Sequence, residues 1–161
     1  VNYYNCGMDG EKSYLNHDLN RDGIKKAFLV LSDVNNYPLL FHCAIGTDRT
    51  GFIAFLINCL AGVSLDDMCR DYVFSSFASI NGIRNSNVIK EYARILNADY
   101  SANNNYSIGA TNLLKSLGLT TGQINVVKEM ITLGYVATEH HASTNWSVSS
   151  IDPDVYHEKI C

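Results

Sequence analysis

The chain has 161 residues, of which 47% are hydrophobic, and this is enough for one domain with a sizeable core. Its formal net charge of −4, without a basic stripe, argues against a nucleic-acid-binding surface, so we expect no nucleic-acid partner. No apolar run reaches the length of a transmembrane segment. The five cysteines form no CxxC pair, so the sequence predicts neither a disulfide framework nor a metal site.

The first part of the chain is predicted to contain one helix and one strand. Residues 1–20 are polar and indicate loop or extended chain, with at most one further strand near 1–4. Apolar residues recur at helical spacing within 22–31, which predicts a helix there. After a turn-rich stretch, the apolar run 38–41 is typical of a buried strand.

The second part is predicted to be a series of helices. The segment 50–61 is almost wholly apolar, so we expect a central, buried helix that ends at Gly62. Ser64 is a suitable cap for the helix that follows. The Asn- and Ser-rich stretch 97–107 predicts a long surface loop. The remaining helices are predicted over 65–78, 87–96, 108–117 and 120–133.

A cysteine and an arginine stand at the junction between the predicted strand and the predicted central helix. Cys43 follows the strand, and Arg49 comes just before the helix. Such a junction directs several backbone N–H groups and the positive end of a helix dipole at one point. A cysteine there should have a lowered pKa, and an arginine can place two N–H donors on phosphate-type oxygens. The local chemistry therefore predicts a cysteine that attacks a bound phosphate ester.

This junction resembles the phosphate-binding signature of the cysteine-dependent protein tyrosine phosphatase superfamily, through the string His42-Cys43-Ala44-Ile45-Gly46-Thr47-Asp48-Arg49-Thr50-Gly51. The Asp before the Arg is typical of a microbial branch, and the likeness continues through 62–67 and Asp71-Tyr72. The resemblance implies an α/β, tyrosine phosphatase-like fold with a helix-rich C-terminal half. In that family most of a mixed sheet precedes the cysteine, so we expect the sheet to be incomplete in this chain.

The resemblance also implies a domain organisation and an activity. Residues 1–134 are expected to form a phosphatase-like catalytic domain without its N-terminal part, and 135–161 a polar C-terminal tail. The expected reaction is the hydrolysis of phosphotyrosine without a cofactor. Its partners would be a phosphoprotein or phospholipid substrate, with a phosphate or sulfate ion fitting the loop. A reactive cysteine needs a reduced thiol, but the compartment stays open between cytoplasmic and secreted.

Two other functions remain open at this point. One is a phosphoinositide or dual-specificity phosphatase, which would use the same loop. The other, from a different class, is a catalytically weak phosphate-binding interaction module. A sulfur-transferring or arsenate-reducing enzyme also uses a cysteine loop, but the Arg49-Thr50-Gly51 ending argues against it.

Each residue of the loop has an expected role in phosphate ester hydrolysis. Cys43 is the expected nucleophile, Arg49 the clamp on the phosphate oxygens, and Thr50 a hydrogen-bond donor to the thiolate. His42 is expected either to orient the loop or to be a satisfied core histidine. The substrate-binding backbone N–H groups are expected to be those of Ala44, Ile45, Gly46, Thr47, Asp48 and Arg49.

The group that protonates the leaving oxygen is less well determined. Asp48 is the preferred general acid, because the resembled branch is thought to use the Asp inside the loop. Asp9 is the alternative, since most of the superfamily uses an Asp well before the cysteine. Asp48 could instead have a structural role and bond to loop amides.

Two further residues bear on the substrate. Many lipid-active relatives have lysine where this chain has Thr47, so the loop lacks that positive charge. Arg84 could supply a second basic contact from the connection that follows Asp71-Tyr72, or it could be a plain surface charge.

Overall fold

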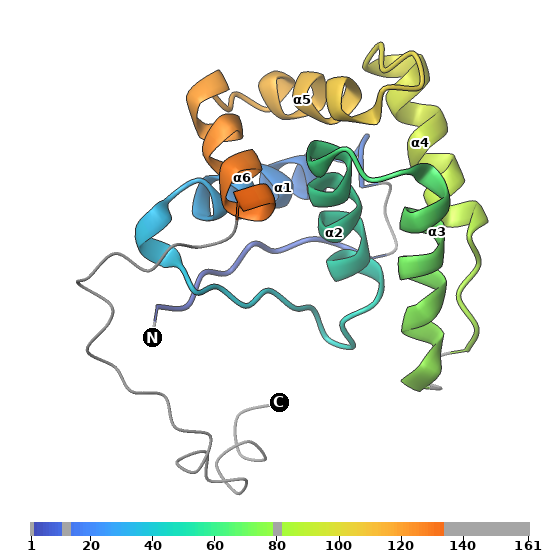
Figure 1. The fold of residues 1–161 in the computed structure, drawn as a ribbon. Coiled ribbons are helices and arrows are strands. Elements are labelled where there is room, and N and C mark those ends of the chain that lie inside the picture. Colours follow the sequence, from blue (N-terminus) through green and yellow to red (C-terminus); the bar gives the residue numbers. More distant parts are fainter. Residues whose placement is uncertain (1, 11–13, 79–81, 134–161) are drawn as a thin grey trace, which may run out of the picture.

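The computed structural model describes residues 2–10, 14–78 and 82–133, and within these ranges the chain is helical (Figure 1). Six α-helices and two short 3₁₀ helices follow one another. Their bounds are α1 Asp18–Leu31, η1 Val34–Asn36, α2 Asp48–Ala61, α3 Leu65–Phe74, η2 Ser75–Ala78, α4 Asn87–Asp99, α5 Tyr106–Ser116 and α6 Thr121–Leu133. None of these helices is long and apolar enough to cross a membrane.

Helix α2 is the centre of the packing, as its apolar sequence predicts. It contacts α3, α5 and α6, and in Figure 1 it lies between the pair α3 and α4 on one side and α1 and α6 on the other. Its buried residues follow the helical period and lie on one broad face of the helix: Phe52, Ile53, Phe55, Leu56, Cys59 and Leu60. Gly62 ends it with φ of 75°, a left-handed conformation that glycine adopts without strain.

The helix ends follow the capping chemistry of the sequence. The Ser64 hydroxyl accepts a hydrogen bond from the Asp67 amide at 3.2 Å and begins α3. At the start of α6, Thr120 and Gln123 form a reciprocal capping box in which each side chain accepts from the other's backbone amide. The predicted helix over 22–31 is confirmed, although α1 starts earlier, at Asp18.

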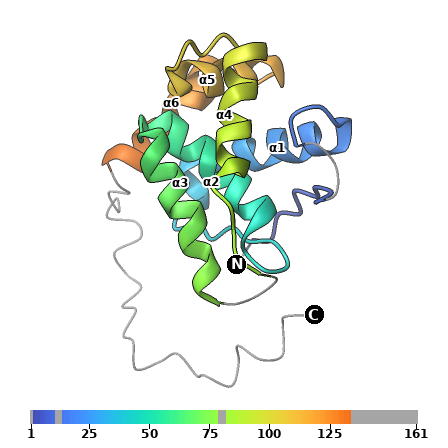
Figure 2. The same ribbon diagram turned by 90° about the vertical axis from the view of Figure 1, so that its right-hand side faces the viewer.

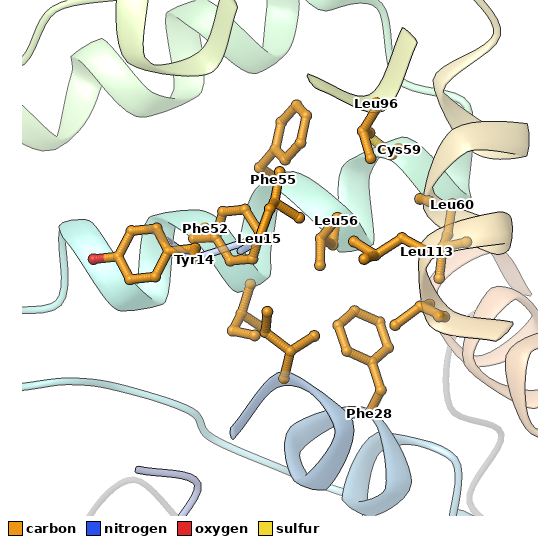
Figure 3. Close-up of a cluster of buried hydrophobic side chains, with 14 of the residues drawn as sticks. Tyr14, Leu15, Phe28, Phe52, Phe55, Leu56, Cys59, Leu60, Leu96 and Leu113 are labelled. Atoms are coloured by element: carbon orange, nitrogen blue, oxygen red, sulfur yellow. The ribbon is translucent and has the colours of Figure 1, made fainter. Parts of the chain in front are cut away.

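An aromatic cluster joins the N-terminal segment to α2 and α4, and Figure 3 shows its members Tyr14, Phe52 and Phe55. The Tyr14 ring stacks on Phe52 with centroids 4.9 Å apart, and Phe52 meets Tyr92 of α4 edge-on at the same distance. Phe55 completes the group, 5.6 Å from Tyr92. The cluster extends the apolar core to the first turns of α2, close to the loop that carries Cys43.

The predicted buried strand at 38–41 is not formed. The described residues contain no strand, so the expected α/β class and its sheet are not found in them. Residues 38–42 have no regular secondary structure, Leu40 is 83% exposed, and no neighbouring backbone pairs with this segment in the described ranges. A strand needs a partner for its N–H and C=O groups, and an apolar run alone does not provide one. The N-terminal segment 2–10 is likewise not a strand.

The predicted loop over 97–107 is shorter than expected. Helix α4 continues to Asp99 and α5 starts at Tyr106, so the connection is 100–105. It is also anchored rather than purely superficial, because Ala102 is fully buried and the Asn97 side chain accepts from the Asn104 amide at 2.9 Å. Asparagine suits such a turn because it tolerates positive φ, as at Asn103 and Asn104.

Candidate active site

The loop before α2 turns back on itself around the sulfur of Cys43. Gly46 has φ of 73°, a conformation that residues with a Cβ rarely adopt. Helix α2 then begins at Asp48, with Thr47 at the N-cap position. As a result, backbone N–H groups from the loop and from the first helical turn are directed at one point, as the junction chemistry predicts.

The Cys43 thiol is half-buried and acidic for a cysteine. Burial by itself raises its pKa, but hydrogen bonds from the Thr50 hydroxyl and from the amides of Thr50, Ile45 and Gly46 together outweigh burial. They lower the pKa of Cys43 from 9.0 to about 7. Cys59, by contrast, is in the core of α2 without such donors, and burial raises its pKa to about 12. Of the four cysteines in the described ranges, Cys43 is thus the one whose surroundings favour a thiolate near neutral pH.

The Thr50 hydroxyl is placed to serve this thiolate. Its oxygen is buried, and apart from the Cys43 sulfur it has no hydrogen-bond partner among the described residues. A buried hydroxyl without a partner is costly, and the Cys43 sulfur is the group that its donor can reach. The hydroxyl gains a full charge-assisted bond only when the thiol loses its proton, and this difference is what lowers the pKa.

Replacing Thr50 by valine is expected to raise the pKa of Cys43, because valine keeps the branched shape but lacks the donor. The midpoint of Cys43 alkylation by iodoacetamide against pH, followed by mass spectrometry, should move up by about one pH unit from about 7. A matched control is Thr111→Val in α5, whose hydroxyl donates to the Ser107 carbonyl at 2.7 Å. An unchanged midpoint in Thr50→Val would contradict this account.

Arg49 lies in the first turn of α2 against the N-terminal segment. Its Nη1 donates to the Met8 carbonyl at 3.4 Å, and a Cβ built at Gly10 would lie 3.8 Å from its Nε. The Asn20 side chain fixes this segment, because it accepts from the Asp9 amide at 2.6 Å and donates to the Asp9 carbonyl at 3.0 Å. The position of the Arg49 guanidinium therefore depends on chain that precedes α1.

Asp48 and Arg84 form an ion pair beside the loop. Arg84 Nη1 lies 3.1 Å from Asp48 Oδ1, and Arg84 Nη2 donates to the Thr47 hydroxyl at 2.7 Å. The Tyr72 hydroxyl donates to the same Asp48 oxygen at 3.3 Å. The Arg84 side chain is only 13% exposed, against 41% for Asp48, so the interpretation of Arg84 as a plain surface charge is wrong. Figure 2 shows the segment 82–86 passing the N-terminal end of α2.

His42 is placed differently from a core histidine. Its side chain is exposed, and its Nδ1 lies 3.1 Å from the Cys43 carbonyl oxygen. The ring can thus steady the loop backbone next to the cysteine. Within the described ranges, no group of three or more His, Cys, Asp or Glu side chains could hold a metal ion.

Comparison with known proteins agrees with this geometry. The tyrosine phosphatase family, as a sequence family, matches residues 8–125. This chain belongs to the tyrosine phosphatase family. The matched range contains the loop, both arginines and the segment that contacts Arg49.

Curated relatives match over shorter stretches. A protein of Meyerozyma guilliermondii named "Putative tyrosine-protein phosphatase OCA1" is 39% identical over 54 residues, which are 34% of this chain and 29% of that protein. "Inositol diphosphatase DSP2" of Oryza sativa subsp. japonica is 32% identical over 77 residues, 48% of this chain and 35% of that protein. The match thus spans about a third of the length of these relatives. No solved structure matches the chain at a significant level.

Sequence reasoning misses the roles of some residues in the candidate site. The sequence indicates Tyr72 through the resemblance and as an inward-facing helix residue, but its bond to Asp48 depends on how α3 packs against α2. Tyr14 was not singled out at all, since it lies in a polar stretch without periodicity. The structure places both tyrosines in the electrostatic environment of Asp48.

Proposed function

We propose that this chain is a phosphomonoester hydrolase that removes phosphate from phosphotyrosine through a cysteinyl-phosphate intermediate. The observation that carries the proposal is the Cys43 thiol, whose pKa of about 7 is produced by amide and hydroxyl donors at the N-terminus of α2. A phosphate group offers the same donors several oxygens to bind, so one loop can both activate the nucleophile and hold its target. Membership of the tyrosine phosphatase family supports it.

The proposed reaction has two steps. The Cys43 thiolate attacks phosphorus in line, an S–P bond forms, and the bond from phosphorus to the tyrosine oxygen breaks. The leaving oxygen takes a proton from a general acid and departs as tyrosine. Water then attacks the cysteinyl-phosphate, the S–P bond breaks, and inorganic phosphate and the thiolate are released.

Arg49 is proposed to bind the non-bridging oxygens of the phosphate. Among the described residues its guanidinium donates one long hydrogen bond, to the Met8 carbonyl at 3.4 Å, so N–H donors remain for an anion. The planar fork of an arginine matches two phosphate oxygens, whose charge the guanidinium offsets as it redistributes in the transition state. The amides of Ala44 to Arg49 are proposed to bind the same oxygens.

The general acid is proposed to be Asp48, with Asp9 as the alternative. Asp48 lies in the loop, but it is already engaged by Arg84 and Tyr72, so it would have to exchange a partner in order to act. Asp9 belongs to the segment whose Met8 carbonyl accepts from Arg49, which supports a place near the loop for it as well.

The pH–rate profiles of Asp48→Asn and Asp9→Asn are expected to separate the two candidates. Loss of the true acid should remove the fall in rate at high pH and lower the rate on a substrate with a poor leaving group by about 10²-fold or more. The other variant should keep the wild-type profile. If the rates of both variants still fall at high pH, neither Asp48 nor Asp9 is the general acid.

A second candidate function, a phosphoinositide or dual-specificity phosphatase, has one observation in its favour. Thr47 brings no charge to the loop, but its hydroxyl is bound by Arg84, whose guanidinium brings a second cation to the loop. A relative named for inositol diphosphatase activity is consistent with more densely phosphorylated substrates. Relative rates on a phosphotyrosine peptide and on inositol phosphates decide between the two.

The test of the main proposal is the turnover of a chromogenic aryl phosphate. We expect hydrolysis that vanadate inhibits and EDTA leaves unchanged, because the proposed chemistry uses a thiolate and no metal. No turnover, together with retained phosphate binding, would favour the weak phosphate-binding module instead. The proposed boundary between a catalytic domain 1–134 and a tail 135–161 remains a prediction, because 134–161 lie outside the described residues.

A further inference from the structure

Tyr14 has a free hydroxyl beside the candidate site. The side chain is only 7% exposed, and its ring is fixed by stacking on Phe52 at 4.9 Å and by an edge contact with Tyr92 at 6.1 Å. In Figure 3 the hydroxyl points away from the other labelled side chains of the core. No hydrogen bond to a described residue involves this hydroxyl, and its oxygen stays accessible to solvent although the ring is buried, so a ligand can reach it.

The surroundings of the hydroxyl are those of the phosphate loop. A Cβ built at Gly10 would lie 3.8 Å from the Tyr14 oxygen and also 3.8 Å from Arg49 Nε, so the phenol and the guanidinium flank the same glycine. Phe52, on which the ring stacks, lies in α2 one turn after Asp48. The ring is therefore rigidly placed, with its one polar atom next to the clamp arginine.

The charged and titratable groups that act on the Tyr14 hydroxyl belong to the same site. Burial and, after it, the negative charge of Asp48 raise its pKa, Arg49 lowers it, and Cys43 and Tyr72 add smaller increases, which together give a pKa of about 12. The phenol consequently keeps its proton near neutral pH, where the Cys43 thiolate forms. It can donate a hydrogen bond but cannot add negative charge that would repel a phosphate.

We propose that the Tyr14 hydroxyl is a further substrate contact, which donates a hydrogen bond to an oxygen of the phosphate group held by Arg49 and the loop. This rests on the proposed function, because it needs an anion in the loop. An anion oxygen would supply the partner that the hydroxyl lacks, and the fixed ring means that little side-chain entropy is lost on binding. The residue comes from chain before α1, so the site is built from two separate stretches of sequence.

The experiment compares wild type with Tyr14→Phe, which keeps the stacked ring and removes only the oxygen. Inorganic phosphate is titrated as a protectant of Cys43 against iodoacetamide at neutral pH, with the Cys43 peptide quantified by mass spectrometry. Loss of one hydrogen bond to a charged acceptor should weaken protection by about tenfold. The control is Tyr92→Phe, whose ring belongs to the same cluster but whose hydroxyl is not under the influence of Cys43 or Arg49. It should stay within about twofold of wild type.

Three readouts separate a phosphate contact from a structural effect. The alkylation rate without phosphate, and its pH midpoint, should be the same in Tyr14→Phe and wild type, which shows that the loop is intact. The ratio of their phosphate affinities should be constant from pH 6 to pH 8 once phosphate ionisation is accounted for, because the phenol does not ionise there. Equal protection in wild type and Tyr14→Phe would overturn the contact alone. Absence of protection in wild type would overturn the proposed function, and the contact with it.

Discussion

Replacing Cys43 by serine is expected to abolish the turnover of an aryl phosphate, with a loss of at least about 10⁴-fold. The loop lowers the pKa of a thiol from 9.0 to about 7, whereas a serine hydroxyl ionises so far above neutral pH that the same donors cannot make it a nucleophile. Initial rates on a chromogenic substrate measure the loss. Phosphate binding should survive, because the amides and Arg49 remain.

Cys6→Ser is the matched control for this substitution. Cys6 is partly buried in the N-terminal segment, and burial raises the pKa of its thiol instead of lowering it. Its replacement should leave the turnover unchanged. In wild type the acid side of the pH–rate profile should follow Cys43: the lowered pKa means that the thiolate is present above pH about 7 and is lost as pH falls through that value. Turnover by Cys43→Ser would exclude Cys43 as the nucleophile.

Replacing Gly23 by alanine is expected to lower both the stability of the protein and its affinity for phosphate. Alanine normally stabilises a helix interior by about 1 kcal/mol relative to glycine. At Gly23 in α1, however, a Cβ would overlap the Gly7 carbonyl oxygen and lie 2.6 Å from Met8 Cγ. Overpacking against backbone costs about 1–3 kcal/mol, and the helix preference of alanine offsets about 1 kcal/mol of it, so we expect a net fall of up to about 2 kcal/mol in the free energy of unfolding. Urea unfolding measures it.

The loss of phosphate affinity follows from what Gly7 and Met8 are attached to. If this segment is pushed away from α1, the Met8 carbonyl that positions Arg49 moves with it. Gly109→Ala provides the comparison, because a Cβ there would lie 2.7 Å from Ala102 Cβ in the connection between α4 and α5. Gly109→Ala should lower the free energy of unfolding without changing the Michaelis constant for the aryl phosphate, which reports how well the phosphate group is bound. Equal Michaelis constants for Gly23→Ala and wild type would show that Arg49 does not depend on this segment.

The helices were predictable from sequence because their signals are local. The apolar faces, the Ser64 cap and the glycine end at Gly62 all act within a few residues, and each was found where expected. The strand predicted at 38–41 was not found, because a strand needs a partner strand, which can come from any part of the sequence. The expected fold class failed at this point, since the apolar run has no paired neighbour in the described part of the chain.

The candidate site shows the same difference between contacts that are local in sequence and contacts that depend on the fold. Cys43, Arg49 and Thr50 could be assigned from one continuous string, since a loop and a helix N-terminus bring them together without help from the rest of the fold. The contacts of Asp48 cannot be seen in that string, because Tyr72 and Arg84 come from later elements that reach it only through the packing of α2 and α3. The spacing of residues in the sequence does not reveal side-chain contacts that form only through tertiary packing.

The ion pair between Arg84 and Asp48 has a consequence for the charge balance at the loop. Without Arg84 the loop would hold two acidic groups, Asp48 and the Cys43 thiolate that forms above pH about 7, beside the guanidinium of Arg49. The ion pair with Arg84 offsets the charge of Asp48, so Arg49 stays available to a phosphate dianion that approaches the thiolate, in a chain whose overall charge is −4.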